Sequence, residues 1–433
     1  MQTAYQLAHA ILSLTRDLLL ADDGAAVNTV RTPLTTPFSN ASQTDWSEGV
    51  RLWNAHGRGM LAQLPSRACP ACGGRERRPL FESYDGYPYV ECAECSCWYV
   101  PLHVDAPLFD RFLEACPAAR RVADRSFTSR QSQAGVEANL ERVGRYLDLL
   151  LPLLPEENRK SYLDVGCGLG HSLVAAKARN LNALGIESSD PCIAIATRNG
   201  LDVRRISAEL PATRFSLISF WESLEHMTDP AAVLSRCLEM LDERGILAFT
   251  VPNQNSPMVR VQRGDCSVVN GGCDTPGHIN LFNPSSIGRL LERTGFTLLA
   301  LDGQYGLSLP ELLSYTAGNT RGAQDLLNGL PIDSGISDLA NVVTRAIGPA
   351  ISVLERVTLT TPILFGFACR KGSAATFSAA VESFHARRKA ELVEEIESST
   401  PVIPDRAAHL RRRLWESEQR IALLERERAE VPQ

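Results

Sequence analysis

The sequence has no excess of basic residues and no long uninterrupted apolar segment. Its 433 residues include 44 Lys and Arg against 50 Asp and Glu, a formal net charge of −6. Proteins that bind DNA or long RNA usually show the opposite balance, so we expect no long nucleic acid as a partner. The longest apolar region, residues 336–357, is interrupted by Asp338, Arg345 and Pro349. A membrane span needs about 20 mostly apolar residues, so we expect none.

A secretory signal is also lacking. The first residues, Met-Gln-Thr-Ala, carry no basic segment, and the apolar stretch after them is interrupted by Arg16 and Asp17. A signal peptide would begin with a basic segment followed by an uninterrupted apolar stretch. We therefore expect a cytoplasmic protein. Of its 12 cysteines, eight are scattered, and the four that form two close pairs are more suited to binding metal than to forming disulfides.

Four of the cysteines form two CxxC motifs separated by nineteen residues; they are Cys69, Cys72, Cys92 and Cys95. Two thiolates on one tight turn can bind the same ion, and two such turns complete a tetrahedral set. Gly73 permits the tight backbone, and residues 81–90 would supply a hairpin. Because thiolates fill all four positions, the predicted zinc ion is structural. Cys97 is either a spare ligand or a small buried side chain.

Strands and helices alternate from residue 161 onward. Apolar strand-like runs occupy residues 161–165, 181–186, 217–220, 246–251, 296–301 and 363–369. Helical stretches between them imply parallel βαβ units. We therefore predict an α/β fold with a doubly wound, Rossmann-like sheet.

Most of the chain outside the ribbon and the α/β domain is predicted to be helical. The predicted parts are a helical N-terminal segment (1–66), a zinc ribbon (67–101), a helical linker or cap (102–160), an α/β domain (161–373) with a helical insertion (304–360), and a charged helical tail (374–433). The tail has heptad spacing at Leu410, Leu414, Ser417, Ile421, Leu424, Arg428 and Val431. Three heptads are few for a coiled coil. A solvated single helix and a homo-oligomer formed through this helix are both consistent with the pattern.

A glycine-rich loop follows the first strand of this domain and opens a helix. Its candidate cofactor-binding residues are Asp164, Gly166, Cys167, Gly168 and Gly170. Glycines let the backbone approach a ligand at the carboxyl edge of the sheet. The spacing is GxGxG, because His171 stands where the third glycine of a dinucleotide motif would be. Asp164 would repel a pyrophosphate but attract an ammonium group, which disfavours a nicotinamide dehydrogenase.

A second acid lies at the end of the next strand. Glu187 is twenty-one residues past Gly166, where a carboxylate can accept both ribose hydroxyls. Together with the loop, it resembles the cofactor site of class I S-adenosylmethionine-dependent methyltransferases. That resemblance implies a seven-stranded sheet and S-adenosylmethionine as cofactor. Ser207 and Glu209 are both candidates for the adenine contact.

The resemblance extends over residues 161–303, about a third of the chain. Residues 215–230, 245–253 and 278–286 look like the fourth strand, the fifth strand and a later loop of the ubiquinone-type O-methyltransferase branch. Ser216 stands where that branch usually carries Asp. The branch implies O-methylation of a hydroxyl on a small molecule, and we extend the expected acceptor to a glycan.

The candidate catalytic residues are Glu222, Glu225, His226 and His278. Spacings of three and four would put the first three on one face of a helical turn. The set resembles the metal site of small-RNA 3′-terminal 2′-O-methyltransferases, and carboxylates with imidazoles suit Mg²⁺ or Mn²⁺. A metal would acidify the acceptor hydroxyl. The alternative is that His226 or His278 is a general base without metal.

Two other functions remain open. A zinc ribbon before such a domain also resembles sugar C-methyltransferases of biosynthetic pathways, although those carry a further α/β domain. A scaffold that binds S-adenosylmethionine without turnover is the second alternative, and the intact loop and the acidic-histidine cluster argue against it.

Overall fold

The computed structural model describes residues 61–83, 87–104, 124, 127–206, 213–262, 278–304 and 351–399. The chain divides into two units, one of residues 32–308 and 356–384 and a smaller one of residues 1–31, 309–355 and 385–433. Most of the predicted N-terminal segment and of the 304–360 insertion lies outside the described residues, as do Ser207, Glu209 and the heptad positions.

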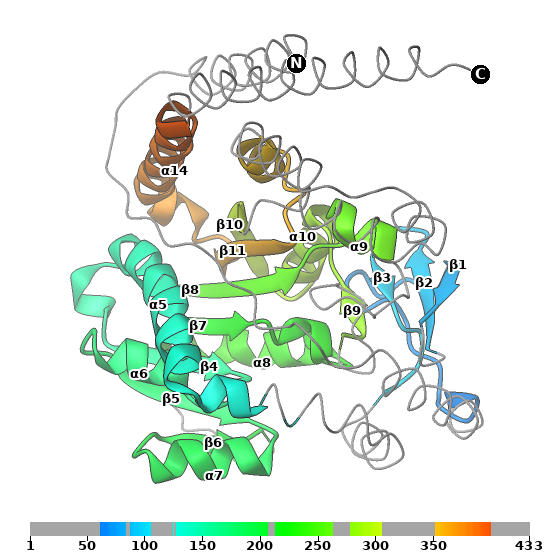
Figure 1. Ribbon diagram of the computed structural model, residues 1–433, viewed down its shortest axis with the longest axis horizontal. Helices are drawn as coiled ribbons and strands as arrows, with labels where there is room; N and C mark the ends of the chain where they lie inside the picture. The colour runs from blue at the N-terminus through cyan, green and yellow to red at the C-terminus, as the bar shows by residue number, and fades with distance from the viewer. Residues whose placement is uncertain are drawn as a thin grey trace, which may run out of the picture. The chain divides into compact units, whose positions relative to one another are not determined.

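A seven-stranded sheet forms the centre of the larger unit (Figure 1). Its strands are β4 (Ser161–Val165), β5 (Asn182–Glu187), β6 (Val203–Arg205), β7 (Phe215–Trp221), β8 (Leu241–Pro252), β10 (Phe296–Gln304) and β11 (Ile363–Arg370). Their spatial order is β10-β11-β8-β7-β4-β5-β6. The strands from β4 to β8 pair in parallel, and β11 is antiparallel to both of its neighbours. The predicted doubly wound, seven-stranded α/β sheet is confirmed.

Helices follow the strands. They are α5 (Gln133–Leu150), α6 (His171–Lys177), α7 (Asp190–Arg198), α8 (Pro230–Met240), α9 (Pro257–Gln262), α10 (Pro284–Arg293) and α14 (Ser378–Ser399), with 3₁₀ turns η1 (Leu151–Leu153), η2 (Glu156–Asn158), η3 (Leu224–His226) and η4 (Ala374–Phe377). Two of the helices begin in the same way: the side chains of Asp229 and Asn283 accept backbone N–H groups, and a proline follows each. A capping acceptor followed by proline satisfies and pre-shapes a first helical turn.

Side chains alternate along the central strands and so build two cores. Tyr162 and Leu217 pack with residues of α5, α6 and α7. Their neighbours Leu163 and Ile218 pack with residues of α8 and α10. Because successive strand residues point to opposite faces, both faces of the sheet are apolar and both are covered by helices.

A second, four-stranded sheet lies beside the larger one. It contains β1 (Arg77–Glu82), β2 (Pro88–Cys92), β3 (Trp98–Tyr99) and β9 (Asn280–Leu281), in that order and antiparallel. The pairing of β1 with β2 confirms the predicted hairpin. The sequence did not predict β9, which joins the 67–101 ribbon to the segment that carries His278.

Other boundaries differ from prediction. β6 was missed because its three residues, Val-Arg-Arg, form no apolar run, and β8 begins earlier, at Leu241, than the run starting at 246. In the predicted linker, α5 is helical, whereas residues 102–104 are not. α14, which ends at Ser399, lies within the predicted helical tail.

The smaller unit is described only at residues 351–355 and 385–399, which are helical. Arg388 there forms an ion pair with Glu391. Within the described parts of the chain, no helix is both long and apolar enough to cross a bilayer.

Candidate functional site

The glycine loop between β4 and α6 faces open space at one position. Gly166, Gly168 and Gly170 have φ of 83°, 53° and 83°, which L side chains rarely adopt. A Cβ atom on Gly166 would lie 2.7 Å from Ser223, and one on Gly170 would lie 2.4 Å from Leu201. A Cβ atom on Gly168 would meet nothing within 4 Å. The loop is therefore packed at its ends and open at Gly168, where a ligand can approach the backbone.

Glu187 is fixed beside this opening at the end of β5. Its Oε2 accepts the backbone N–H of Gly168 at 2.7 Å, and its Oε1 accepts those of Ser188 and Ser189 at 2.7 and 2.8 Å. Three backbone bonds hold the carboxylate in one orientation. A fixed acceptor next to an open glycine fits the nucleoside end of S-adenosylmethionine, and the ribose contact stays a prediction.

Asp164 lies buried beneath the loop. One carboxylate oxygen accepts the hydroxyl of Ser219 at 2.7 Å, and the other accepts the hydroxyl of Ser172. Burial raises the pKa of Asp164 to about 6, although both hydroxyl bonds oppose that shift. The carboxyl group therefore titrates just below neutrality. The attraction of Asp164 for the ammonium group of the cofactor stays a prediction.

Two residues singled out in the sequence, Cys167 and Ser216, have structural roles. Cys167 is buried, and a Cβ atom on Gly185 would lie 2.5 Å from its Sγ atom; burial also raises the pKa of its thiol, so it is a packed side chain of low reactivity. Ser216 bonds the backbone N and O of Ser161 at 3.1 and 2.8 Å. Ser216 thus ties the starts of β7 and β4 together, far along the strands from the glycine loop.

Arg142 was not predicted as a site residue. Its guanidinium donates to Glu222 at 2.5 Å and to Asn139 at 3.0 Å. It is close enough to Asp164 for its charge to oppose, in part, the effect of burial on the pKa of that group. In the sequence, Arg142 is one of two arginines in the amphipathic helix α5. A sequence clue to its role is Tyr146, an aromatic residue one helical turn later. Tyr146 stacks on Trp221 with ring centroids 5.0 Å apart, so the face of α5 that carries Arg142 points toward the end of β7.

Glu222 occupies a strained position directly after β7. Its φ is 53°, unusual for a residue with a side chain, and its N–H bonds the backbone O and the hydroxyl of Thr250, both at 3.1 Å. The helical turn begins only at Leu224. The predicted helical face shared by Glu222, Glu225 and His226 is therefore wrong, because the chain bends at Glu222 and the carboxylate pairs with Arg142.

The other three candidate catalytic residues do come together. One ligand atom from each of Glu225, His226 and His278 lies within 4.8 Å of the others. The His226 and His278 rings are 4.8 Å apart, and His226 Nε2 is 3.9 Å from Glu225 Oε1. Glu225 is 0% exposed, and neither carboxylate oxygen accepts a hydrogen bond from a described residue.

Burial raises the pKa of Glu225 well above its ordinary value, and the charge of Glu222 adds to the effect. A buried carboxylate that accepts no hydrogen bond is costly in free energy. Such a group beside two imidazoles is suited to bind a cation or to exchange a proton. The three residues therefore fit both predicted alternatives, a metal site and a histidine general base without metal.

The segment after His278 holds this cluster in place. The N–H of Ile279 donates to the backbone O of Glu225 at 2.9 Å. The side-chain amide of Asn280 donates to the backbone O atoms of Leu224 and Met227 at 3.0 and 2.7 Å. These hydrogen bonds to the backbone of the η3 turn hold it against the segment that carries His278, and so they bring the two histidines together.

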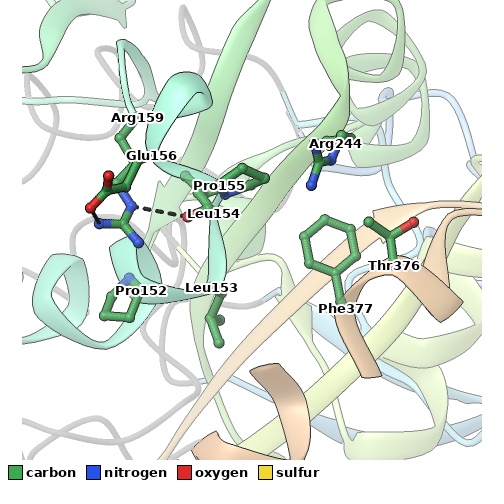
Figure 2. Close-up of a pocket in the computed structure, with 9 residues that line it drawn as sticks. All are labelled: Pro152, Leu153, Leu154, Pro155, Glu156, Arg159, Arg244, Thr376 and Phe377. Carbon is green, nitrogen blue, oxygen red and sulfur yellow. Dashed lines mark hydrogen bonds and ion pairs between the residues drawn. The ribbon is translucent and has the colours of Figure 1, made fainter. Parts of the chain in front are cut away.

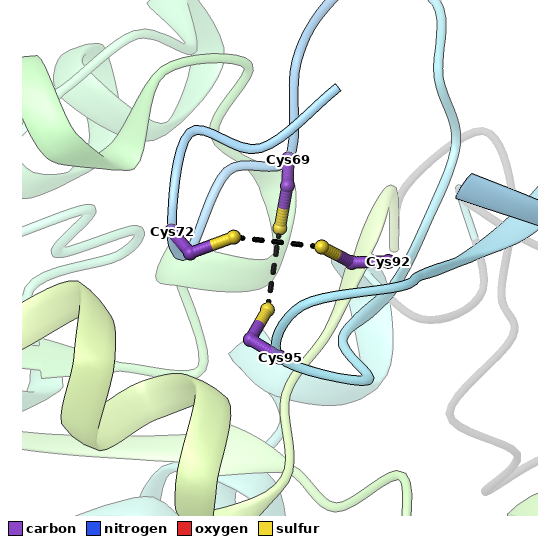
Figure 3. Close-up of side chains that lie close together, drawn as sticks. All are labelled: Cys69, Cys72, Cys92 and Cys95. Atoms are coloured by element: carbon purple, nitrogen blue, oxygen red, sulfur yellow. Dashed lines mark hydrogen bonds between the residues drawn. The ribbon is translucent and has the colours of Figure 1, made fainter. Parts of the chain in front are cut away.

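The four cysteines of the CxxC motifs converge from two tight turns (Figure 3). Cys69 and Cys95 Sγ atoms are 3.5 Å apart, and those of Cys72 and Cys92 are 3.4 Å apart. A tetrahedral zinc ion with bonds of about 2.3 Å separates its sulfurs by about 3.8 Å. The thiols are thus slightly closer than in a loaded site, and the set fits zinc.

The turns around these cysteines have the form that thiolate sites need. The N–H of Gly74 donates to Cys72 Sγ at 3.3 Å. Hydrogen bonding from Cys95 lowers the pKa of Cys69, and the same bond raises the pKa of Cys95, which is the behaviour of thiols that share a proton. Cys97 lies outside the cluster, buried with its Sγ atom 3.5 Å from the backbone O of Leu281, so it is a packed side chain.

A surface hollow of about 330 Å³ lies elsewhere on the larger unit (Figure 2). Residues 152–156, Arg159 and Arg244 form its wall together with Thr376 and Phe377. Residues 152–159 precede β4 and Arg244 lies near the start of β8, so the hollow is at the amino ends of these strands. The glycine loop and the Glu225 cluster lie at their carboxyl ends, where α/β proteins bind ligands.

The sheet order and the open glycine loop agree with the expected class I methyltransferase domain. Residues 137–301 match the family model described as a methyltransferase domain. The matched range begins in α5 and ends in β10, so it contains the loop, Glu187 and the Glu225 cluster, and it leaves the ribbon outside.

Curated relatives agree with this class. The ubiquinone biosynthesis O-methyltransferase of Nitrosomonas europaea is 32% identical over 120 residues, which are 25% of this chain and 50% of that protein. The protein of the same name from Pseudomonas entomophila is 34% identical over 106 residues, 22% of this chain and 46% of that protein. The chain thus spans about half the length of the curated relatives it matches.

Solved structures of methyltransferases are also similar. A S-adenosylmethionine-dependent methyltransferase from Mesorhizobium loti is 16% identical, with a TM-score of 0.35 over 53% of this chain and 100% of that one. The plantazolicin methyltransferase BamL, solved with SAH, is 14% identical, with a TM-score of 0.37 over 57% of this chain and 90% of that one.

Proposed function

We propose that the chain transfers a methyl group from S-adenosylmethionine to a hydroxyl oxygen of a small molecule or glycan. The observation that carries this proposal is the loop that is open only at Gly168, with Glu187 fixed beside it. When bound, S-adenosylmethionine supplies an electrophilic methyl carbon, so the protein needs chiefly to align the acceptor and remove its proton.

Residues on the cofactor side bind and orient. Glu187 accepts the ribose hydroxyls, and the backbone at Gly168 lies against the ligand. The charges of Asp164 and Arg142 suit the ammonium and the carboxylate of a methionine moiety, respectively. Arg142 pairs with Glu222 in the present structure, so Glu222 holds the guanidinium in place by the end of β7.

Residues on the acceptor side handle the proton. Glu225, His226 and His278 would hold a divalent ion, Mg²⁺ or Mn²⁺, which lowers the pKa of a coordinated hydroxyl. An acceptor with two adjacent hydroxyls would suit such a site, as the ubiquinone-type resemblance implies. Without an ion, one of the histidines acts as general base. The ribbon cysteines would hold a structural zinc ion.

Labelled S-adenosylmethionine offered with a panel of catechols and vicinal-diol sugars tests this proposal. We expect product from at least one acceptor, and none from the Gly168→Val variant, which cannot bind the cofactor. If a metal takes part, each of Glu225→Gln, His226→Gln and His278→Gln loses turnover and keeps cofactor binding. If a general base acts alone, only one histidine is critical. Binding without turnover over the whole panel would favour the scaffold alternative.

A cytoplasmic location is also a proposal, as is self-association through the heptad residues beyond α14. Size-exclusion chromatography of the full chain and of a chain ending at Ser399 would test the second. A homo-oligomer that persists without residues 400–433 would contradict it.

A further inference from the structure

One arginine side chain connects three separate segments of the larger unit. Arg67 donates from Nε to the backbone O of Val100 at 2.8 Å and from Nη1 to that of Thr228 at 2.8 Å. Its Nη2 atom donates to the backbone O of Ile279 at 2.8 Å and to the side chain of Asn280 at 2.7 Å. Since a guanidinium is a rigid, planar fork of donors, these four bonds fix the three segments relative to one another.

The three segments belong to the ribbon and to the Glu225 cluster. Val100 directly follows β3 of the ribbon, Thr228 lies two residues after His226, and Ile279 directly follows His278. Arg67 itself lies two residues before the first ribbon cysteine. One side chain from the ribbon therefore holds the backbones that carry both histidines.

A second ribbon side chain acts on the same backbone. The hydroxyl of Tyr89, on β2, donates to the backbone O of His278 at 2.5 Å. β3 in turn pairs with β9, with Trp98 opposite Leu281 and Tyr99 opposite Asn280. His278 is thus reached from the ribbon by a tyrosine hydroxyl, by the arginine fork and by a strand pair that begins two residues later.

The strands that supply these contacts are set by the cysteine turns. Cys92 is the last residue of β2, and the turn that contains Cys95 leads into β3, with the N–H of Cys92 bonded to the O of Cys97 at 2.9 Å. A metal ion held by Cys92 and Cys95 would fix this turn. The relative placement of Tyr89 and β3 then follows from the metal site.

We propose that Arg67 and Tyr89 are positioning residues through which the Cys69–Cys72–Cys92–Cys95 metal site holds His278 against Glu225 and His226. The ribbon is then part of the acceptor side of the methyltransferase site. The placement of the histidines follows from the contacts alone, whereas its effect on turnover rests on the proposed function.

Histidine-selective ¹⁵N labelling tests the placement directly. The chain has 8 histidines, and His226→Gln and His278→Gln assign the two ring signals. We expect Arg67→Ala and Tyr89→Phe to shift both signals and to leave that of His171, on α6 beside the cofactor loop, unchanged. Arg78→Ala is the matched control, because the Arg78 side chain is 69% exposed on the ribbon and pairs with Glu91 across the hairpin. It should change neither signal.

Turnover and cofactor binding give the second measurement. A displacement of about 1 Å in a reacting group can reduce a rate by about a hundredfold. We expect a loss of that order in kcat for Arg67→Ala, an unchanged KM for S-adenosylmethionine, and partial recovery when guanidinium ion is added. Releasing the ribbon metal with an organomercurial should shift the same two ring signals.

Wild-type His226 and His278 signals in folded Arg67→Ala would overturn the proposal. Should Arg67→Ala fail to fold, Tyr89→Phe removes a single hydroxyl and decides the question, because unshifted signals in that variant overturn the proposal equally. If the unaltered protein methylates no acceptor but the signals shift as expected, the proposed function fails and the placement stands.

Discussion

Replacing Glu225 with glutamine should stabilise the metal-free protein at neutral pH. Glu225 is 0% exposed, and no described residue donates a hydrogen bond to its carboxylate. Burying an unpaired polar group costs about 1 to 3 kcal/mol, and more when it is charged. Gln keeps the shape of the side chain and does not ionise. Because Gln leaves the same buried polar group and removes only its ionisation, we expect Glu225→Gln to raise the free energy of unfolding at pH 7 by up to about 1.4 kcal/mol for each pH unit above the ordinary glutamate pKa of about 4.3.

The pH dependence follows from the direction of the pKa shift. Because burial raises the pKa of Glu225, the folded state binds more protons than the unfolded state above the ordinary glutamate pKa of about 4.3. The stability of the unaltered protein therefore falls as the pH rises from that value through the raised pKa. Gln has no such titration, so the advantage of the variant should widen from about pH 4.5 to pH 7.

A divalent ion should reverse the order of stability. Binding at a concentration of about 1,000 times Kd adds about 4.1 kcal/mol to a protein that holds the ion and nothing to one that does not, which exceeds the advantage of the variant. Urea unfolding of desalted protein, with and without Mg²⁺ or Mn²⁺, measures both effects. Glu239→Gln, an exposed site on α8, is the control and should change neither. A less stable Glu225→Gln variant that keeps the wild-type pH dependence would refute the reasoning.

Three further outcomes are expected. Affinity for S-adenosylmethionine should fall as the pH falls through about 6, the pKa of Asp164, because protonation removes a charge that attracts the ammonium group; calorimetry of Asp164→Asn should show no such dependence. Arg142→Met should weaken cofactor binding by about tenfold, or about 1.4 kcal/mol, whereas Arg145→Met, exposed on the same helix, should not. Cys69→Ser should lose the zinc that we expect at about one ion per chain, and elemental analysis that finds equal zinc in both proteins would contradict this.

The fold could be predicted from the sequence where apolar runs are long. Strands β4, β5, β7 and β11 lie within one or two residues of their predicted ends, because strands that are buried on both faces of a sheet are nearly continuous apolar runs. β6 carries two arginines in three residues, and β9 has only two residues. Their positions are set by pairing with distant strands, which no local pattern records.

The sequence predicted most residues of the site, but it did not predict how they are arranged in space. The glycine loop, Glu187 and the cysteine turns follow from local spacing. Glu222 was misplaced because a helical face was assumed across a residue whose φ is positive. Arg142 and Arg67 were missed because each acts across more than 70 residues of chain, at separations of 80 and 161 for their bonds to Glu222 and Thr228.

Calorimetric titration with S-adenosylmethionine, on the unaltered chain and on Gly168→Val, tests the central claim most directly. The claim predicts saturable binding by the unaltered chain, no binding of NAD, and loss of binding in Gly168→Val, since a side chain there fills the open space beside Glu187. Gly372→Val is the control, because Gly372 also has a positive φ, 93°, with no atom within 4 Å of its Cβ position, and it should bind as the unaltered chain does. Equal affinity in Gly168→Val and in the unaltered chain, or no binding of S-adenosylmethionine by either, would contradict the claim.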